Sequence, residues 1–375
     1  MNGFNLSNIQ DAKLGSTQVS ALYYGSTKLW PLGTDYSKEY LTIESLKNNN
    51  EVYFVTINSD KTRLGKSIEY STDLSNWISV TDEWKDDASP FINLSQGQKV
   101  YLRGTNSKYA TSASVYDEFY CTQNFSLSGN IMSLIYGLNF TGQTTLNDTY
   151  TFACMFRNNA SHLRSITNLV LPATTLTTYC YYYMFSGCTG LISVPSDLLP
   201  ATTLAYGCYY GMFYHCTSLT SVPELPAMKL SPYCYVYMFE NCPITSISLP
   251  ATTLAQRCYA NMIPGTNITS LTLPATTLYE GCYRTICYGC TSLQSVTIMG
   301  EHLANSCLQF AFYGCTSLNY IKFMSLDGPT TTNSKTSSWV TNVPSGGTFV
   351  KNRSATWTNS FGNNAIPSGW TVVNV

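Results

Sequence analysis

The chain has 375 residues, enough for two or three domains whose cores need no metal ion or disulfide. Only 11% of the residues are charged while 29 are tyrosine, a mixture typical of β-rich proteins with polar but uncharged surfaces. The formal net charge of -1 and the lack of a Lys/Arg cluster argue against a nucleic-acid partner.

Residues 1–34 form a segment of their own. They lack the basic and apolar regions of a signal peptide, and no run of about 18 apolar residues occurs in the chain, so we expect neither that export route nor membrane insertion. Residues 19–31, VSALYYGSTKLWP, predict two strands around a Gly-Ser turn.

This run resembles a short segment, roughly V-x-x-I-Y-x-G-S-x-x-V-W-P, of virion proteins from tailed bacteriophages, especially those of gut bacteria. The resemblance implies that residues 1–34 anchor the chain to other virion proteins. The anchoring side chains would then be Tyr23, Tyr24, Leu29 and Trp30. An ordinary β-hairpin is the alternative interpretation.

Residues 35–146 show short alternating runs such as 52–57 (VYFVTI) and 99–102 (KVYL), separated by polar turns. This pattern predicts an antiparallel β-sandwich, which could bind carbohydrate. Asp82, Glu83, Asp86 and Asp87 could hold a calcium ion, but they lack the spacing of a known calcium loop. We therefore expect a solvated acidic turn there and no metal site.

Residues 147–325 repeat a unit written L-x-S-[VIL]-x-L-P-A-T-T-L-x-x-x-C-Y-x-x-M-F-x-x-C-T-S. The prolines of the Leu-Pro-Ala steps are 28, 26, 24 and 24 residues apart. A repeat of this length predicts a solenoid, because each coil has an apolar face that only its neighbours can cover. Apolar pairs such as Leu191/Val194 and Leu293/Val296 predict one short parallel strand in each coil. A degenerate earlier copy begins at Thr151, in which Met155-Phe156 holds the Met-Phe position without either flanking cysteine.

The pattern is similar to the BspA-like leucine-rich repeats of bacterial surface proteins, approximately L-x-x-L-x-L-P-x-x-L-x-x-I-x-x-x-A-F-x-x-C. Leu318, Ile321 and residues 311–315 (AFYGC) match it closely, while other coils replace Ala-Phe and add a second cysteine. The resemblance implies a leucine-rich-repeat fold that supplies binding surfaces and no shared chemistry.

Two cysteines eight residues apart recur in almost every coil, with Thr266 as the exception at the second position. We expect them to be small buried packing residues. Disulfides between coils are the alternative, because stacked coils lie within bridging distance. Metal binding is disfavoured, since Cys287 and Cys290 form a lone C-x2-C pair and the chain has three histidines.

A tyrosine follows the first cysteine in five coils, and extra rings occur at Tyr182, Tyr183, Tyr210 and Tyr237. We expect the first tyrosine to pack between coils with its hydroxyl at the surface. The extra rings vary between coils, so we predict that they contact a sugar or a protein partner.

Residues 326–375 leave the period and are rich in Gly, Ser and Thr, so we assign them the role of a C-terminal cap. The fold class is therefore mainly β: an N-terminal hairpin, a sandwich, a solenoid and a cap. No cofactor is expected, and no residues have a catalytic arrangement, because the histidines lack triad-like partners and acids are scarce in the repeats.

The combined prediction is a non-enzymatic bacteriophage virion protein, of tail-fibre or surface-decorating type and homo-oligomeric. It would bind a host surface glycan or protein through the solenoid. A bacterial cell-surface adhesin is the second hypothesis, and a virion-borne glycan depolymerase is the third.

Overall fold

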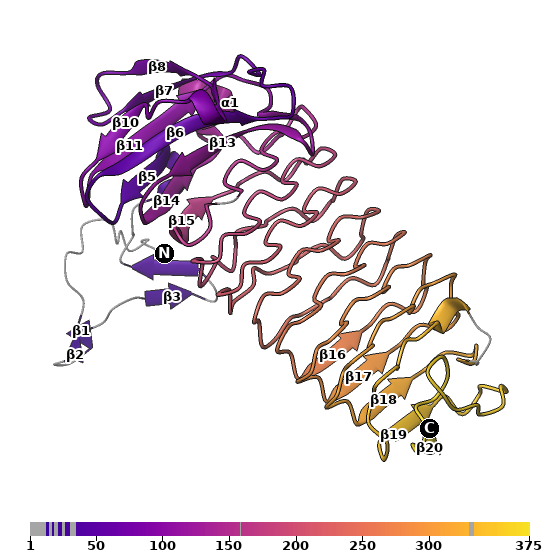
Figure 1. Cartoon of the computed structure of the whole chain (residues 1–375). Coiled ribbons are helices and arrows are strands. Elements are labelled where there is room, and N and C mark those ends of the chain that lie inside the picture. Colours follow the sequence, from indigo (N-terminus) through magenta and orange to yellow (C-terminus); the bar gives the residue numbers. More distant parts are fainter. Residues whose placement is uncertain are drawn as a thin grey trace.

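A two-sheet domain leads into a long solenoid in the computed structural model of the chain (Figure 1). The structure describes residues 35–157, 159–329 and 334–375, together with the backbone of four short strands between residues 13 and 30. Helices in these ranges are short: α1 (Ser133–Tyr136), η1 (Tyr36–Lys38), η2 (Lys85–Asp87), η3 (Gly137–Asn139) and η4 (Ser334–Thr336). None of the helices within them has the length and apolar character needed to cross a membrane.

The N-terminal domain contains two sheets over a shared core, which confirms the predicted mainly β fold. One sheet has the order β10-β6-β13-β12 with β9 beside β6, and the other has the order β15-β14-β5-β11-β7-β8. Side chains of β11 alternate between solvent and core, with Val100 and Leu102 fully buried. The strands are β5 (Leu41–Ser45), β6 (Asn50–Ile57), β7 (Ser67–Ser71), β8 (Ile78–Thr81), β9 (Glu83–Trp84), β10 (Ile92–Leu94), β11 (Lys99–Gly104), β12 (Ala110–Ser112), β13 (Val115–Cys121), β14 (Phe125–Asn130) and β15 (Leu163–Val170).

Strand β14 joins the sandwich to the solenoid, since it pairs antiparallel with β5 and parallel with β15. Rings continue across the junction: the Phe119 and Phe156 centroids are 5.8 Å apart, and those of Tyr109 and Phe152 are 6.4 Å apart. The two parts therefore share one hydrophobic core, and the sandwich covers the apolar face of the first coil. The boundary predicted near residue 146 stays a prediction.

In the C-terminal half of the solenoid the coils pair through parallel strands, as expected. Strands β16 (Ser270–Leu273), β17 (Ser295–Ile298) and β18 (Tyr320–Phe323) are in register, so that buried Leu271, Val296 and Ile321 lie side by side. A second column of single-residue bridges follows the Leu-Pro-Ala steps and joins Thr203, Lys229, Thr253, Thr277 and His302.

The expectation of one strand in every coil is wrong for the middle coils. Residues 191–198, 219–224 and 244–249 contain no regular strand, although all of them lie in the described part of the chain. Pro195 and Pro223 follow the inward-facing valines of the first two segments and remove ladder donors, and the coil lengths of 28 and 26 residues interrupt the register. Isolated hydrogen bonds remain, such as that from the Thr220 N–H to the Ile192 carbonyl, at 3.0 Å.

The C-terminal segment extends the ladder beyond β18. Strands β19 (Thr348–Lys351) and β20 (Thr371–Asn374) add to it in parallel register. Buried Trp339 and Trp370 fill the core beneath them, and the ring of Trp339 lies 5.6 Å from that of Phe323. Since the residues of β20 are mostly exposed, β20 is the terminal strand of this ladder, and the capping role stays a prediction.

The N-terminal segment contains two antiparallel strand pairs: β1 (Lys13–Leu14) with β2 (Thr17–Gln18), and β3 (Leu22–Tyr24) with β4 (Thr27–Trp30). The second pair has the backbone of the predicted hairpin. The side chains of Tyr23, Tyr24, Leu29 and Trp30 lie outside the described residues, so their anchoring role stays a prediction.

Candidate functional site

The side of each coil that carries the cysteines is a run of turns. The N–H groups of Tyr182 and Met184 donate to carbonyls three residues back, at 3.1 and 3.3 Å, whereas those of Tyr181 and Tyr183 donate to the next coil, at 3.0 and 2.8 Å. This alternation satisfies buried backbone groups without a strand or helix. Every fourth residue from Tyr179 onward in this coil has a positive φ, which closes the successive turns.

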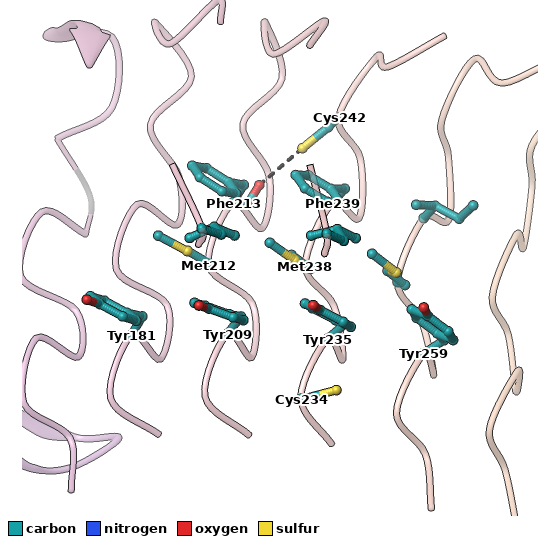
Figure 2. Close-up of a cluster of buried hydrophobic side chains, with 14 of the residues drawn as sticks. Tyr181, Tyr209, Met212, Phe213, Cys234, Tyr235, Met238, Phe239, Cys242 and Tyr259 are labelled. Atoms are coloured by element: carbon teal, nitrogen blue, oxygen red, sulfur yellow. Dashed lines mark hydrogen bonds between the residues drawn. The ribbon is translucent and has the colours of Figure 1, made fainter. Parts of the chain in front are cut away.

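Two columns of stacked rings fill the interior behind these turns (Figure 2). The tyrosines after the first cysteines are fully buried and nearly parallel, with neighbouring centroids between 5.7 and 6.0 Å apart: Tyr181, Tyr209, Tyr235, Tyr259 and Tyr283. The second column consists of Phe156, Phe185, Phe213 and Phe239. The first tyrosines are thus core residues, as predicted.

The hydroxyl groups of that tyrosine column depart from the prediction. Those of Tyr181, Tyr259 and Tyr283 are buried rather than at the surface, and each lacks a hydrogen-bond partner within the described part of the protein. The ring occupies the interior so fully that its para position also lies inside the coil.

Except for Cys290, whose sulfur is bonded to Cys287, the second cysteine of each coil acts as a small buried hydrogen-bond donor. Its thiol donates to a carbonyl of the preceding coil, as from Cys216 to Phe185 at 3.2 Å and from Cys242 to Phe213 at 3.1 Å (Figure 2). Burial raises the pKa of Cys242 to about 12, so the thiol stays neutral and is a poor nucleophile. Thr266 occupies the same position and donates to the Ile263 carbonyl at 2.9 Å.

These contacts support the predicted packing role of the cysteines. Cys287 and Cys290 form a disulfide within one coil, and no bridge joins two coils among the described cysteines. The alternative of disulfides between coils is therefore not what this structure contains. No group of three or more potential metal-ligating side chains occurs in the described part of the chain.

The extra tyrosines predicted to make contacts come together on the outer side of the turns. The ring centroids of Tyr182 and Tyr210 are 5.1 Å apart, those of Tyr182 and Tyr183 are 4.6 Å apart, and those of Tyr210 and Tyr237 are 5.5 Å apart. All four side chains are partly exposed. Their predicted binding role remains a prediction.

Further rings that sequence reasoning missed complete this surface. They lie one or two residues before the first cysteine position, or six residues after it. These three positions hold other residues in other coils, so the signal was a tyrosine at an outward position of neighbouring coils. Tyr206 is the most exposed of them, at 39%. We define the tyrosine patch as Tyr150, Tyr179, Tyr182, Tyr183, Tyr206, Tyr210, Tyr214, Tyr233 and Tyr237, a connected set of ring contacts.

The backbone of the tyrosine patch is strained. Tyr179, Tyr183 and Tyr237 have φ values of 56°, 48° and 57°, in the left-handed region that a bulky residue rarely adopts. Each such residue costs about 1–2 kcal/mol relative to the right-handed conformation. Glycines of the next coil leave space for the rings, because a Cβ on Gly207 would lie 2.4 Å from the ring of Tyr179.

Charged groups flank the tyrosine patch at its two ends. The guanidinium of Arg157 lies 5.3 Å from the ring centroid of Tyr183, and that of Arg257 lies 5.9 Å from the centroid of Tyr233. Burial raises the pKa of Tyr182 to about 12, so its hydroxyl remains a neutral hydrogen-bonding group. Beside Tyr214, burial raises the pKa of Glu240 to about 7.

The acidic residues of the sandwich do not form the calcium site considered above. Asp82 is fully buried and shares the Thr56 hydroxyl with Asp117, whereas Asp86 and Asp87 are exposed in η2. The expectation of a solvated turn is therefore wrong for Asp82. Burial raises the pKa of Asp117 to about 8. The hydrogen bond from Thr56 acts in the opposite direction, and the nearby carboxylate of Asp82 raises the pKa further.

Comparison with known families bears on the solenoid. The family model of the BspA type leucine rich repeat region matches residues 154–263 and 233–336, with six copies. The coils are therefore similar to BspA-type leucine-rich repeats. A search among curated proteins and a search among solved structures each found no match. The comparisons give no support to the virion resemblance of residues 19–31, which stays a prediction.

A solenoid of BspA-type leucine-rich repeats fits a surface or adhesin-like repeat protein, and such repeats typically bind partners rather than catalyse reactions. The tyrosine patch lies on the coils from Tyr150 to Tyr237, within or next to the matched residues. It is the candidate functional site.

Proposed function

We propose that this protein is a non-enzymatic recognition protein whose tyrosine patch binds a glycan or protein on a host cell surface. The observation that carries the proposal is the patch itself: partly exposed rings in mutual contact across four coils, some of them in an unfavourable backbone conformation. Packing alone does not require tyrosine at these positions, because other coils place Asn261 and Thr285 where Tyr183 and Tyr237 lie.

The chemistry of the patch suits sugars. Tyrosine offers an apolar face for a sugar ring and a hydroxyl that exchanges hydrogen bonds with sugar hydroxyls. A tyrosine hydroxyl is protonated at physiological pH, and burial raises the pKa of Tyr182 further, to about 12. Because neighbouring rings support one another, little side-chain entropy is lost on binding.

The test measures binding of the purified full chain to a panel of host strains and their surface polysaccharides. Tyr182→Ala and Tyr210→Ala should each weaken binding about twofold to tenfold, the range expected for an aromatic contact. Tyr288→Ala is the matched control, because Tyr288 is 42% exposed and stacks on Tyr313 outside the patch. Equal binding by all three variants and the parent chain would contradict the proposal.

We also propose a location for the protein. On the resemblance of residues 19–31, the N-terminal segment attaches a homo-oligomer to other virion proteins of a tailed bacteriophage, as a tail-fibre or surface-decorating component. A bacterial cell-surface adhesin is the alternative. Antibodies against the solenoid should label phage particles, and deletion of residues 1–34 should abolish that labelling; labelling of bacterial cells alone would favour the adhesin.

The non-enzymatic part of the proposal has its own test. A glycan depolymerase hydrolyses its ligand, usually with a pair of carboxylates. Incubation with any polysaccharide that the chain binds should release no reducing sugar. Release that survives purification and is lost on substitution of Glu240 would establish the depolymerase instead.

A further inference from the structure

A pocket opens at the C-terminal edge of the tyrosine patch, where the rings meet two arginines. Its volume is about 200 Å³. The walls come from successive coils: Tyr210, Tyr233, Val236, Tyr237, Arg257, Ala260, Asn261, Arg284 and Thr285. We call this the arginine pocket. It is smaller than the ~300–1,000 Å³ of sites for drug-sized ligands, so it admits a single sugar residue or its substituent.

No ion pair within the described ranges neutralises the positive charge of the arginine pocket. Neither Arg257 nor Arg284 forms an ion pair with any residue in the described ranges, and no carboxylate lines the pocket. Glu280, in the same coil as Arg284, accepts a hydrogen bond from Gln256 at 3.2 Å. The Nε of Arg257 is buried and finds no hydrogen-bond partner among the described residues.

Arg257 is held in place by its surroundings. Its guanidinium lies 5.9 Å from the ring centroid of Tyr233, and a Cβ added to Gly281 of the next coil would lie 3.0 Å from its Cγ. The absence of a side chain at Gly281 thus lets the arginine stem lie against the coil. A planar guanidinium fixed in this way is suited to bidentate binding of a carboxylate or sulfate.

We propose that the arginine pocket binds the carboxylate or sulfate of an acidic sugar while the adjoining tyrosine rings stack on that sugar and its neighbours. The inference rests on the proposed function and narrows it to anionic saccharides. Continuity of the pocket with the tyrosine patch, through Tyr210, Tyr233 and Tyr237, favours a saccharide over an acidic peptide.

Calorimetric titration of the full chain would test this with three probes: a polygalacturonate oligomer, a sulfated chondroitin oligomer and a neutral maltooligosaccharide of similar length. The parent chain should prefer one or both acidic oligomers, with affinity that falls as salt is added. Arg257→Gln and Arg284→Gln should each weaken acidic-oligomer binding about tenfold or more and weaken neutral-oligomer binding much less. Arg353→Gln, which removes an exposed charge near the C-terminus, is the matched control.

The outcomes separate the two proposals. Binding of all three oligomers without an acidic preference, or without an effect of the arginine variants, would overturn the pocket assignment and leave the tyrosine patch intact. If poly-glutamate binds more tightly than the acidic oligosaccharides and its binding also depends on the two arginines, the assignment of the ligand as a saccharide would be overturned. Arg257→Lys keeps the positive charge but not the two parallel N–H donors of the guanidinium. If the contact is bidentate, this variant should bind the acidic oligomers more tightly than Arg257→Gln but less tightly than the parent chain. Failure of every saccharide and every host strain to bind would contradict both proposals.

Discussion

Gly211→Ala offers a sharp test of how the tyrosine patch is assembled. Gly211 has a φ of 61°, and an added Cβ would lie 2.6, 2.7 and 2.8 Å from three atoms of the Tyr183 ring. The substitution therefore forces both a left-handed alanine and a displacement of that ring. Gly289 supplies the matched control, because its φ is 68° and no atom lies within 4 Å of its added Cβ.

The two substitutions should differ by the energy of the ring contact. Gly289→Ala carries only the left-handed backbone, about 1–2 kcal/mol. Gly211→Ala adds about 1–3 kcal/mol for the overpacked ring, so its total loss of unfolding free energy should be about 2–5 kcal/mol. Urea unfolding followed by circular dichroism measures both values. Equal losses in the two variants would refute the claim that Gly211 makes room for Tyr183.

Three further predictions concern the buried groups. Tyr259→Phe should raise the unfolding free energy by about 1 kcal/mol, because it removes a buried hydroxyl that lacks a partner among the described residues. The first coil already has a phenylalanine, Phe152, at the equivalent position. A loss of stability in urea unfolding would show that the hydroxyl is paired. The pKa of Asp117 is raised in the fold to about 8, so folding favours the protonated carboxyl, and stability should fall as the pH rises from about 4 to about 8. Asp117→Asn should flatten this dependence of stability on pH. An unchanged dependence, measured by thermal melting, would contradict the prediction. Burial also raises the pKa of Cys180 and Cys315 to about 12, so iodoacetamide should label these residues only after denaturation, as read by mass spectrometry; labelling of the native chain would contradict their neutral, packed state.

The repeat could be recognised from the sequence because its buried positions recur at fixed spacing. Cysteine, tyrosine, methionine and phenylalanine hold fixed places in successive coils, so both the solenoid and the buried position of the first tyrosines could be predicted. The turn conformation of that side was not predictable from the pattern, because its positive φ values occur at positions filled by residues as different as Tyr179, Gly207 and Arg257. Only the stacking of coils explains why all of them adopt the same backbone.

The regular strand predicted for the first two middle coils failed for an identifiable reason. Val194 and Val222 have the right spacing for a core-facing strand, but the prolines after them remove donors that the ladder needs. The two prolines were visible in the sequence, but the regular spacing of the apolar residues outweighed them in the prediction. The tyrosines of the patch that were missed are a different case, because they contact rings of adjacent coils. The longer coils of 28 and 26 residues shift the repeat, so the sequence spacing does not show which tyrosines become neighbours.

Hydroxyl-radical footprinting of the native chain, with and without host-cell envelope polysaccharide, tests the central claim most directly. The tyrosine patch should lose modification when polysaccharide is added, with the largest protection at Tyr206, because this ring is the most exposed of the patch before binding. Tyr279 and Tyr288, which are 44% and 42% exposed outside the patch, should be modified equally in both samples. Protection of these two residues with no change in the patch would contradict the assignment of the tyrosine patch as the recognition surface.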